Sequence, residues 1–129
     1  MNDRCTPATA RRLKELGFPQ PVPAPGQVWY TINDTKIIVT GRKGQTFFCA
    51  TKGGNSLTEI HVSHFDDFAY APTASDILRE LGEDWTMIVA GGGFQIYKHF
   101  QDPQYIFPIA ANDNPAEACA EAWEAKQKS

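Results

Sequence analysis

Three helix starts constrain the fold of this chain more than any other feature of its sequence. Each start places a side chain that can cap a helix directly ahead of an apolar repeat with helical spacing. The three starts are Thr6-Pro7-Ala8-Thr9, Thr73-Ala74-Ser75-Asp76 and Asn114-Pro115-Ala116-Glu117. The last of them opens an alanine-rich amphipathic stretch that ends near Trp123. We therefore expect three helices that share a core with the rest of the chain.

Between the first two helix starts, apolar residues recur with a period of two, which is typical of strands. Val28, Tyr30 and Ile32 would lie on one face of a first strand. A tight turn at Asn33-Asp34 leads to a second strand, in which Ile37 and Val39 face the same way, and 41–44 (Gly-Arg-Lys-Gly) would reverse the chain again. This pattern predicts an antiparallel meander.

Two further strands extend this meander. Residues 46–50 place Phe47 and Phe48 on opposite faces of a third strand, and 57–62 form a fourth. Each connection is short enough for a hairpin, so the neighbours should be antiparallel. A loop over 64–72 would then deliver the chain to the second helix.

The segment after the second helix predicts more strands. Residues 85–90 and 94–100 alternate like two strands joined by the glycines at 91–93, and 105–109 can add another before the last helix. The fold class is therefore α+β, with a mainly antiparallel sheet of about five to seven strands packed with three helices. Residues 1–129 are expected to form a single layered domain.

Within that domain we expect an N-terminal helix over 1–17, a proline-rich arm over 18–26, and the sheet with two further helices over 27–129. Four prolines in the arm prevent regular hydrogen-bonded structure. Such a segment is either a docking strip for a partner or a linker laid along the body of the protein.

Composition excludes some function classes. The formal net charge of −3 provides no positive field for non-specific binding of nucleic acid. No apolar run approaches the roughly 20 residues that span a bilayer, so we expect no membrane association. Three widely spaced cysteines, Cys5, Cys49 and Cys119, are typical of reduced thiols in a cytoplasm, and Cys49 and Cys119 are interpreted as buried structural residues.

Three segments of the sequence resemble small uncharacterised phage and prophage proteins. They are 6–19 (TPATARRLKELGFP), 70–82 (YAPTASDILRELG) and 114–123, and the closing helix is also similar to that of the phage ABA-sandwich family. The resemblance rests on helical scaffold residues, so it assigns no functional residue. It implies a phage genome, the cytoplasm of a bacterial host, and a small non-enzymatic protein that binds host proteins or sequesters nucleotide messengers of host immunity.

One cluster of side chains suggests catalysis. His61, His64, Asp66 and Asp67 could serve a metal-assisted hydrolase or a phosphoesterase. Residues three apart on a strand point to opposite faces, however, so the two histidines converge only if the strand breaks between them. We therefore assign no catalytic residue, no metal and no cofactor.

A ligand site could form where aromatic and basic side chains meet. Stacking on an aromatic ring and pairing with a phosphate are the two contacts that hold a nucleotide. The candidates are Trp29, Tyr30, Arg42, Lys43, Lys52, Tyr97 and Lys98. The glycines at 91–93 are interpreted as a hairpin turn, because no helix start follows them to receive an anion.

These observations favour a non-enzymatic, phage-derived binding protein that captures a host protein or a small signalling nucleotide, with counter-defence as its expected role. Two alternatives stay open. The first is a hydrolase that uses the histidine and aspartate cluster, and the second is a phage structural or assembly component. A homo-oligomer is compatible with each of them.

Overall fold

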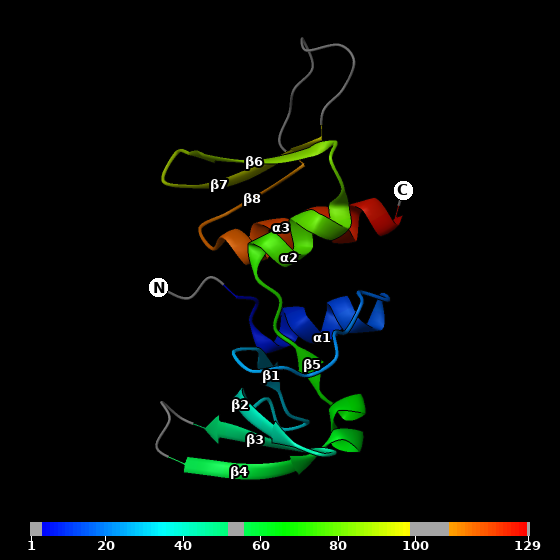
Figure 1. Cartoon of the computed structure of the whole chain (residues 1–129). Helices are drawn as coiled ribbons and strands as arrows, with labels where there is room; N and C mark the ends of the chain where they lie inside the picture. Colours follow the sequence, from blue (N-terminus) through cyan, green and yellow to red (C-terminus); the bar gives the residue numbers. More distant parts are fainter. Residues whose placement is uncertain (1–3, 52–55, 99–108, 129) are drawn as a thin grey trace. The chain divides into compact units, whose positions relative to one another are not determined.

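The computed structural model describes residues 4–51, 56–98 and 109–128, which divide into two compact units (Figure 1). The terminal unit combines Met1–Thr9 with Pro72–Ser129, and the central unit is Ala10–Ala71. Each unit has its own antiparallel sheet. The expectation of a single domain over 1–129 stays a prediction.

The central unit is built on a five-stranded sheet in the order β4-β3-β2-β1-β5, with every neighbouring pair antiparallel. The strands are β1 (Val28–Tyr30), β2 (Lys36–Lys43), β3 (Thr46–Thr51), β4 (Ser56–His61) and β5 (Ala69–Tyr70). A 3-10 helix, η2 (Val62–Asp67), follows β4. Helix α1 (Pro7–Glu15) begins in the terminal unit, and its residues from Ala10 belong to the central unit. The predicted meander is confirmed.

Two turn predictions in this meander are wrong. Ile32 does not continue β1, because the strand ends at Tyr30 and Ile32 lies in the turn, 65% exposed. Gly41 does not begin a reversal either. β2 continues through a bulge between Val39 and Gly41, and the chain turns only at Gly44, which has a φ of 62°. The bulge shifts the pairing by one residue, which lets the strand extend to Lys43.

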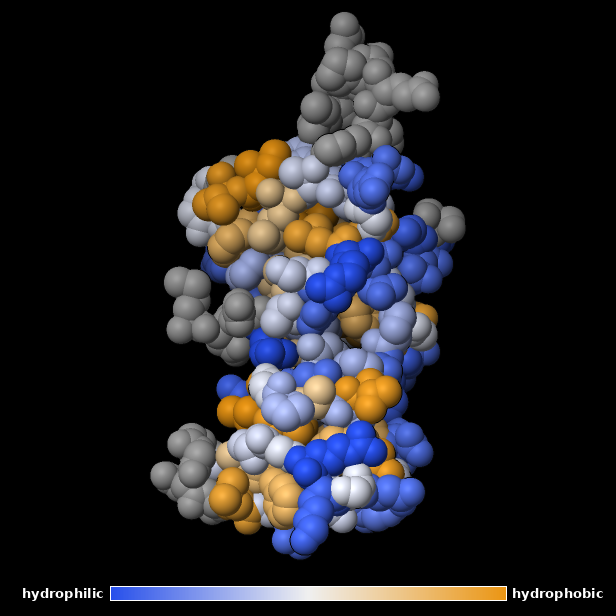
Figure 2. Space-filling model, in the orientation of Figure 1, coloured by the Kyte–Doolittle hydropathy of each residue, from blue (hydrophilic) through white to orange (hydrophobic). Residues whose placement is uncertain are grey.

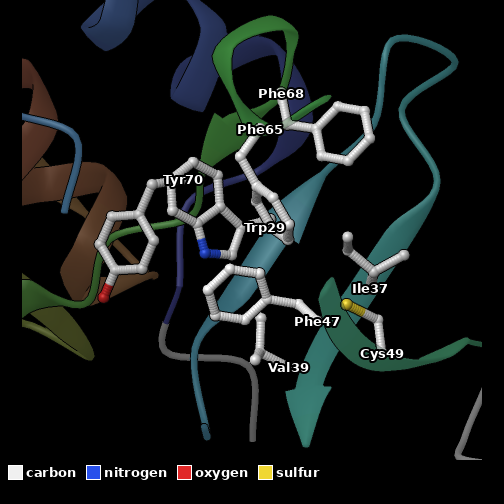
Figure 3. Close-up of a cluster of buried hydrophobic side chains, with 8 residues drawn as sticks. All are labelled: Trp29, Ile37, Val39, Phe47, Cys49, Phe65, Phe68 and Tyr70. Carbon is white, nitrogen blue, oxygen red and sulfur yellow. The ribbon is translucent and has the colours of Figure 1, made fainter. Parts of the chain in front are cut away.

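Aromatic rings fill the core of the central unit. Figure 3 shows the cluster, which consists of Trp29, Ile37, Val39, Phe47, Cys49, Phe65, Phe68 and Tyr70. The Phe65 ring meets Trp29 edge-on at 5.1 Å between centroids, Phe68 at 5.3 Å and Phe47 at 5.4 Å. Edge-to-face contacts at these distances are favourable beyond the area they bury. Phe65 therefore fastens η2 to the sheet.

The segment predicted as a loop over 64–72 contains regular structure. It includes most of η2, and it supplies β5, which pairs with β1. The Ala71 amide also donates a hydrogen bond to the Val28 carbonyl at 2.9 Å. A two-residue strand has no readable period, so only its partner defines it.

The terminal unit is built on a three-stranded sheet in the order β6-β7-β8. Its elements are β6 (Trp85–Ala90), β7 (Gly93–Lys98), β8 (Ala110–Asn112), α2 (Ala74–Leu81) and α3 (Pro115–Lys128). Gly91 and Gly92, with φ of 61° and 81°, form the two-residue turn of the β6–β7 hairpin. The strand predicted over 105–109 falls almost entirely on residues 99–108, which lie outside the described residues.

Both helices of this unit begin as predicted. The Thr73 hydroxyl accepts from the Asp76 amide at 3.2 Å, and the Asp76 carboxylate accepts from the Thr73 amide at 3.0 Å. These two bonds make a capping box at the start of α2. The Asn114 side chain caps α3 by accepting from the amides of Ala116 and Glu117.

Small side chains let α3 approach its neighbours closely. The buried residues of this helix are Pro115, Ala116, Ala118, Cys119, Ala120, Ala122 and Trp123. The alanine-rich stretch before Trp123, which the sequence predicts to be an amphipathic helix, is thus confirmed as one. Trp85 is only half-buried, and it stands at the start of the edge strand β6.

The α+β class is confirmed, with one difference in architecture. The described residues form eight strands in two antiparallel sheets, whereas the sequence pattern predicted a single sheet of about five to seven. Among the described residues, no helix has both the length and the apolar character that a bilayer crossing requires.

Candidate binding site

A groove of about 300 Å³ lies on the central unit beside the proline-rich arm. We call it the arm groove, and four segments build it: the end of α1, the arm, β1 and η2. Its lining residues are Lys14, Gln20, Pro21, Val22, Pro23, Trp29, Val62, Phe65 and Asp66. Ligand pockets commonly measure roughly 300–1,000 Å³, so the arm groove has the size of a small ligand site.

Lys14 fixes one wall of the groove. Its ammonium donates to the main-chain carbonyl oxygens of Asp66, at 2.5 Å, and Phe68, at 2.6 Å. Charge-assisted hydrogen bonds of this kind are stronger than those between neutral groups. The last turn of α1 therefore holds the end of η2 in place.

Glutamine side chains fix the opposite wall. Gln20 accepts from the Tyr70 amide at 2.9 Å and donates to the Phe18 carbonyl at 3.1 Å. These bonds replace the regular main-chain hydrogen bonds that prolines prevent. The first half of the arm is thus tied to β5 and held in one path.

A second glutamine holds the other half of the arm. The Gln27 carbonyl oxygen accepts from the Ala24 amide at 2.9 Å and from the Trp29 indole at 3.0 Å, while its amide group donates to the Val22 carbonyl at 3.2 Å. The arm over 18–26 has no helix or strand, as predicted. It nevertheless forms a fixed wall of a groove.

Apolar surface dominates the interior of the groove. Trp29 is 1% exposed and Phe65 is 5% exposed, so both rings form its floor. Val22 stands at the rim with 72% of its surface exposed. Val22 lines the same groove as the two buried rings, so a bulky apolar group of a ligand would cover its exposed side chain.

The charges at the groove balance each other. The lining includes one cation, Lys14, and one anion, the exposed carboxylate of Asp66. Lys14 already donates to two carbonyls, and a carboxylate nearby repels phosphate. The electrostatics therefore favour a neutral apolar group over an anion.

Four of the residues predicted to bind a nucleotide, Trp29, Tyr30, Arg42 and Lys43, belong to the central unit. Trp29 lines the arm groove, and Tyr30 is buried at 5% exposure, so neither ring offers an open face for stacking. Arg42 donates from Nε to the Gly44 carbonyl at 2.6 Å, and its guanidinium lies 5.1 Å from the Phe47 ring centroid. Lys43 is exposed at the end of β2.

The other predicted residues belong to the terminal unit or lie outside the described residues. Tyr97 donates to the Gln95 side chain at 2.5 Å. The ammonium of Lys98 lies 6.0 Å from the Trp85 ring centroid. Lys52 lies outside the described residues. Within each unit, the structure does not gather these side chains into one stacking and pairing site.

His61 has a structural task at the start of η2. Its Nδ1 accepts from the Ser63 amide at 3.2 Å and lies 2.9 Å from the Ser63 hydroxyl, while Nε2 lies 3.2 Å from the Gln45 side-chain oxygen. These contacts favour the tautomer with the proton on Nε2. A catalytic or ligating role would require His61 to give up this cap.

The remaining members of the histidine and aspartate cluster are exposed. His64, Asp66 and Asp67 lie on η2, and in the described part of the chain no three His, Cys, Asp or Glu side chains are placed to hold a metal ion. The break after His61 that convergence requires is present, because the strand ends there.

The cysteines are buried thiols. Cys5, Cys49 and Cys119 are all fully buried. Desolvation raises the pKa of Cys49, and it raises the pKa of Cys119 to about 12. Since the thiolate is the nucleophile, burial lowers the reactivity of both thiols at neutral pH.

The fold and the groove define the class of protein, an α+β protein with two antiparallel sheets and a groove that is mostly apolar. No protein-family model, curated protein or solved structure was found to match this chain. The resemblance to phage proteins stays a prediction.

The sequence indicated part of the groove. The arm was interpreted as a docking strip or a linker, and Trp29 and Asp66 were named in two different candidate sites. Lys14, Gln20, Val62 and Phe65 were missed. The spacing of the prolines predicts the arm, but no local sequence pattern predicts which residues of other elements line the groove beside it.

Proposed function

We propose that this chain is a non-enzymatic binding protein that captures a host protein, and that the arm groove receives a bulky apolar side chain of that partner. The supporting observation is the chemistry of the groove. Its floor is apolar, and the polar side chains of Lys14 and Gln20 already hydrogen-bond within the central unit. An apolar group can displace water from such a surface without leaving a polar group unpaired.

A protein partner fits this groove better than a nucleotide does. A nucleotide brings phosphates that need free cationic donors. The groove offers one cation that is already hydrogen-bonded to two carbonyls, together with an opposing carboxylate. The buried rings of Trp29 and Phe65 present no open face for a base.

The resemblance to small phage proteins supports a bacterial host as the source of the partner. A phage product that binds a host protein stoichiometrically, without chemistry, would act in counter-defence. The structural role of His61 and the burial of the cysteines are in line with a function that uses no reactive side chain.

Peptide selection on the full chain tests the proposal. Peptides from a random phage-display library that bind the wild type should share a bulky apolar anchor. Val22→Asp should weaken their binding at least about tenfold, because it places a charge at the apolar rim. Leu57→Asp is the matched control. Leu57 is 73% exposed against 72% for Val22, but it lies on β4 outside the groove, so its substitution should leave binding unchanged.

Equal binding by the Val22→Asp variant would contradict the assignment of the groove. A parallel experiment incubates the protein with cyclic oligonucleotides and cyclic ADP-ribose isomers, and then releases bound material by heat. Release of an unchanged nucleotide would show that the partner is a signalling nucleotide and not a host protein. A converted product would show catalysis and would contradict the proposal outright.

A further inference from the structure

Strand β6 is an open edge of the terminal unit's sheet. Among the described residues, β7 is the one strand that pairs with it. Its sequence, WTMIVA, contains no charged residue and no proline. An edge of this kind is a ready template for pairing with another strand.

The other sheet edges are protected by the usual devices. β5 has two residues and β8 has three, so neither can support a long ladder. β4 has six residues, as β6 does, but it contains Glu59 and His61. Short strands and charged side chains are how native proteins prevent edge pairing. β6 is therefore the one long, uncharged edge in the described part of the chain.

Exposed apolar side chains accompany this edge. Ile88 is 44% exposed and Val89 is 73% exposed, and Figure 2 shows hydrophobic surface over the β6–β7 hairpin. Successive residues of a strand point to opposite faces, so Ile88 and Val89 expose apolar surface on both faces of the sheet. A partner that covers both faces at this edge must continue the sheet itself.

The register shows which main-chain groups are open. The Ile96 carbonyl accepts from the Ile109 amide at 2.7 Å, so the main-chain groups of Ile96 face away from β6. Met87 pairs with Ile96, and its own groups must therefore point to the open edge. The same alternation turns the main-chain groups of Val89 and the carbonyl of Trp85 outward.

We propose that β6 pairs with β6 of a second copy of this chain, antiparallel about a two-fold axis at Met87, so that two three-stranded sheets become one. This register places Met87 opposite its own counterpart and Trp85 opposite Val89 of the second copy. The Met87 amide of each copy then meets the Met87 carbonyl of the other copy, and the Val89 amide meets the Trp85 carbonyl of the other copy. Val89, the most exposed apolar residue of the hairpin, is then covered by the indole ring of Trp85 from the second copy. The two-fold axis repeats this contact at the other end of the paired strands.

A strand from an unrelated protein would satisfy the main-chain groups equally well, but not the side chains. A second copy supplies Trp85 opposite Val89 and Val89 opposite Trp85, so a favourable pair of an aromatic and a β-branched side chain forms at both ends. This self-complementarity selects a second copy as the occupant. The inference concerns the terminal unit alone, so it is independent of the arm groove.

Light scattering after size exclusion tests the proposal on the full chain. Wild type should have twice the chain mass at micromolar concentration. Val89→Lys should raise the dissociation constant at least about tenfold, because it places a charge beside Trp85 and near Lys98 of the second copy. Leu57→Lys is the control, since Leu57 is equally exposed at 73% on the edge strand β4, and it should stay dimeric. Circular dichroism confirms that each variant is folded.

A disulfide tests the register. In this arrangement, Thr86 of one copy lies opposite Ile88 of the other copy in a non-hydrogen-bonded pair. The separation of such a pair suits a disulfide. The double variant Thr86→Cys with Ile88→Cys should give a covalent dimer on oxidation, and Ile88→Cys alone should give far less. A monomeric wild type, a dimer unaffected by Val89→Lys, or a dimer lost in Leu57→Lys would each overturn the proposal.

Discussion

The two units of this chain fill their interiors with opposite kinds of side chain. In the central unit, four aromatic contacts with centroid distances of 5.1–5.4 Å join the rings of Trp29, Phe47, Phe65, Phe68 and Tyr70. In the terminal unit, α3 buries mainly alanine and cysteine with a single indole, Trp123. The central unit is stabilised by the packing of large aromatic rings, and the terminal unit is stabilised by the close approach of helix backbones.

This difference predicts how each unit fails. A ring removed from the aromatic cluster leaves a cavity that the remaining rings fill only in part. A small residue enlarged on α3 pushes apart surfaces that depend on contact. Truncation is therefore the sensitive test of the central unit, and enlargement is the sensitive test of the terminal unit.

Phe47→Ala should have the largest effect on stability. Phe47 is 0% exposed, and its ring meets Phe65 in the middle of the cluster. We expect the free energy of unfolding to fall by about 3–5 kcal/mol, measured by urea denaturation. The neighbouring Phe48→Ala is the control, because Phe48 is half-buried on the other face of β3 and should cost less than about 2 kcal/mol.

Hydrogen exchange of Phe47→Ala tests the division into units. Protection should fall chiefly within Ala10–Ala71, where the lost contacts lie. A uniform loss across the whole chain would show instead that the two units unfold together, as the sequence prediction of a single domain requires.

Ala120→Leu should have the second largest effect. Ala120 is 1% exposed on the buried side of α3. Three additional heavy atoms should cost about 1–3 kcal/mol through strain, measured by the same denaturation. Ala125→Leu places the same atoms on an exposed position of the same helix and should change stability by less than about 0.5 kcal/mol. If Ala120→Leu were neutral, α3 would not be packed by close approach.

Features made by neighbouring residues could be predicted from the sequence. The caps of α2 and α3 join side chains to amides two or three residues away, so the motif contains its own partner. The antiparallel meander was predictable for the same reason, because short connections leave little choice of partner.

Features made by distant residues could not be predicted. Lys14 shapes the arm groove by bonding to carbonyls 52 and 54 residues away, and β5 exists only because β1 lies beside it. The grouping of strands into two sheets is also set by tertiary pairing. The nucleotide site stays a prediction, because its residues were chosen by type alone; Trp29 and Tyr30 among them are buried in the core.

Thr73→Ala should have a smaller effect, about 1 kcal/mol. It removes the hydroxyl that accepts from the Asp76 amide, and Thr73→Ser should keep most of the stability because the hydroxyl remains. The corresponding change in the central unit, His61→Ala, should cost less, since Lys14 holds η2 at its other end. Thermal denaturation measures all three. An equal cost for the two alanine variants would mean that the units do not differ in their dependence on local caps.

Alkylation of the cysteines should be the smallest effect in the wild type. In the Phe47→Ala variant, the extent of alkylation should differ clearly between the two units. Burial raises the pKa of both Cys49 and Cys119, so less thiolate is present at any pH below the shifted value. With a pKa of about 12, Cys119 is thiolate in only about one molecule in ten thousand at pH 8. Iodoacetamide should therefore label neither residue in the native wild type, as followed by mass spectrometry of peptides. In Phe47→Ala, Cys49 should become reactive while Cys119 stays protected, because the cavity opens beside β3 alone. Labelling of both cysteines at equal rates in that variant would contradict the separation of the two cores.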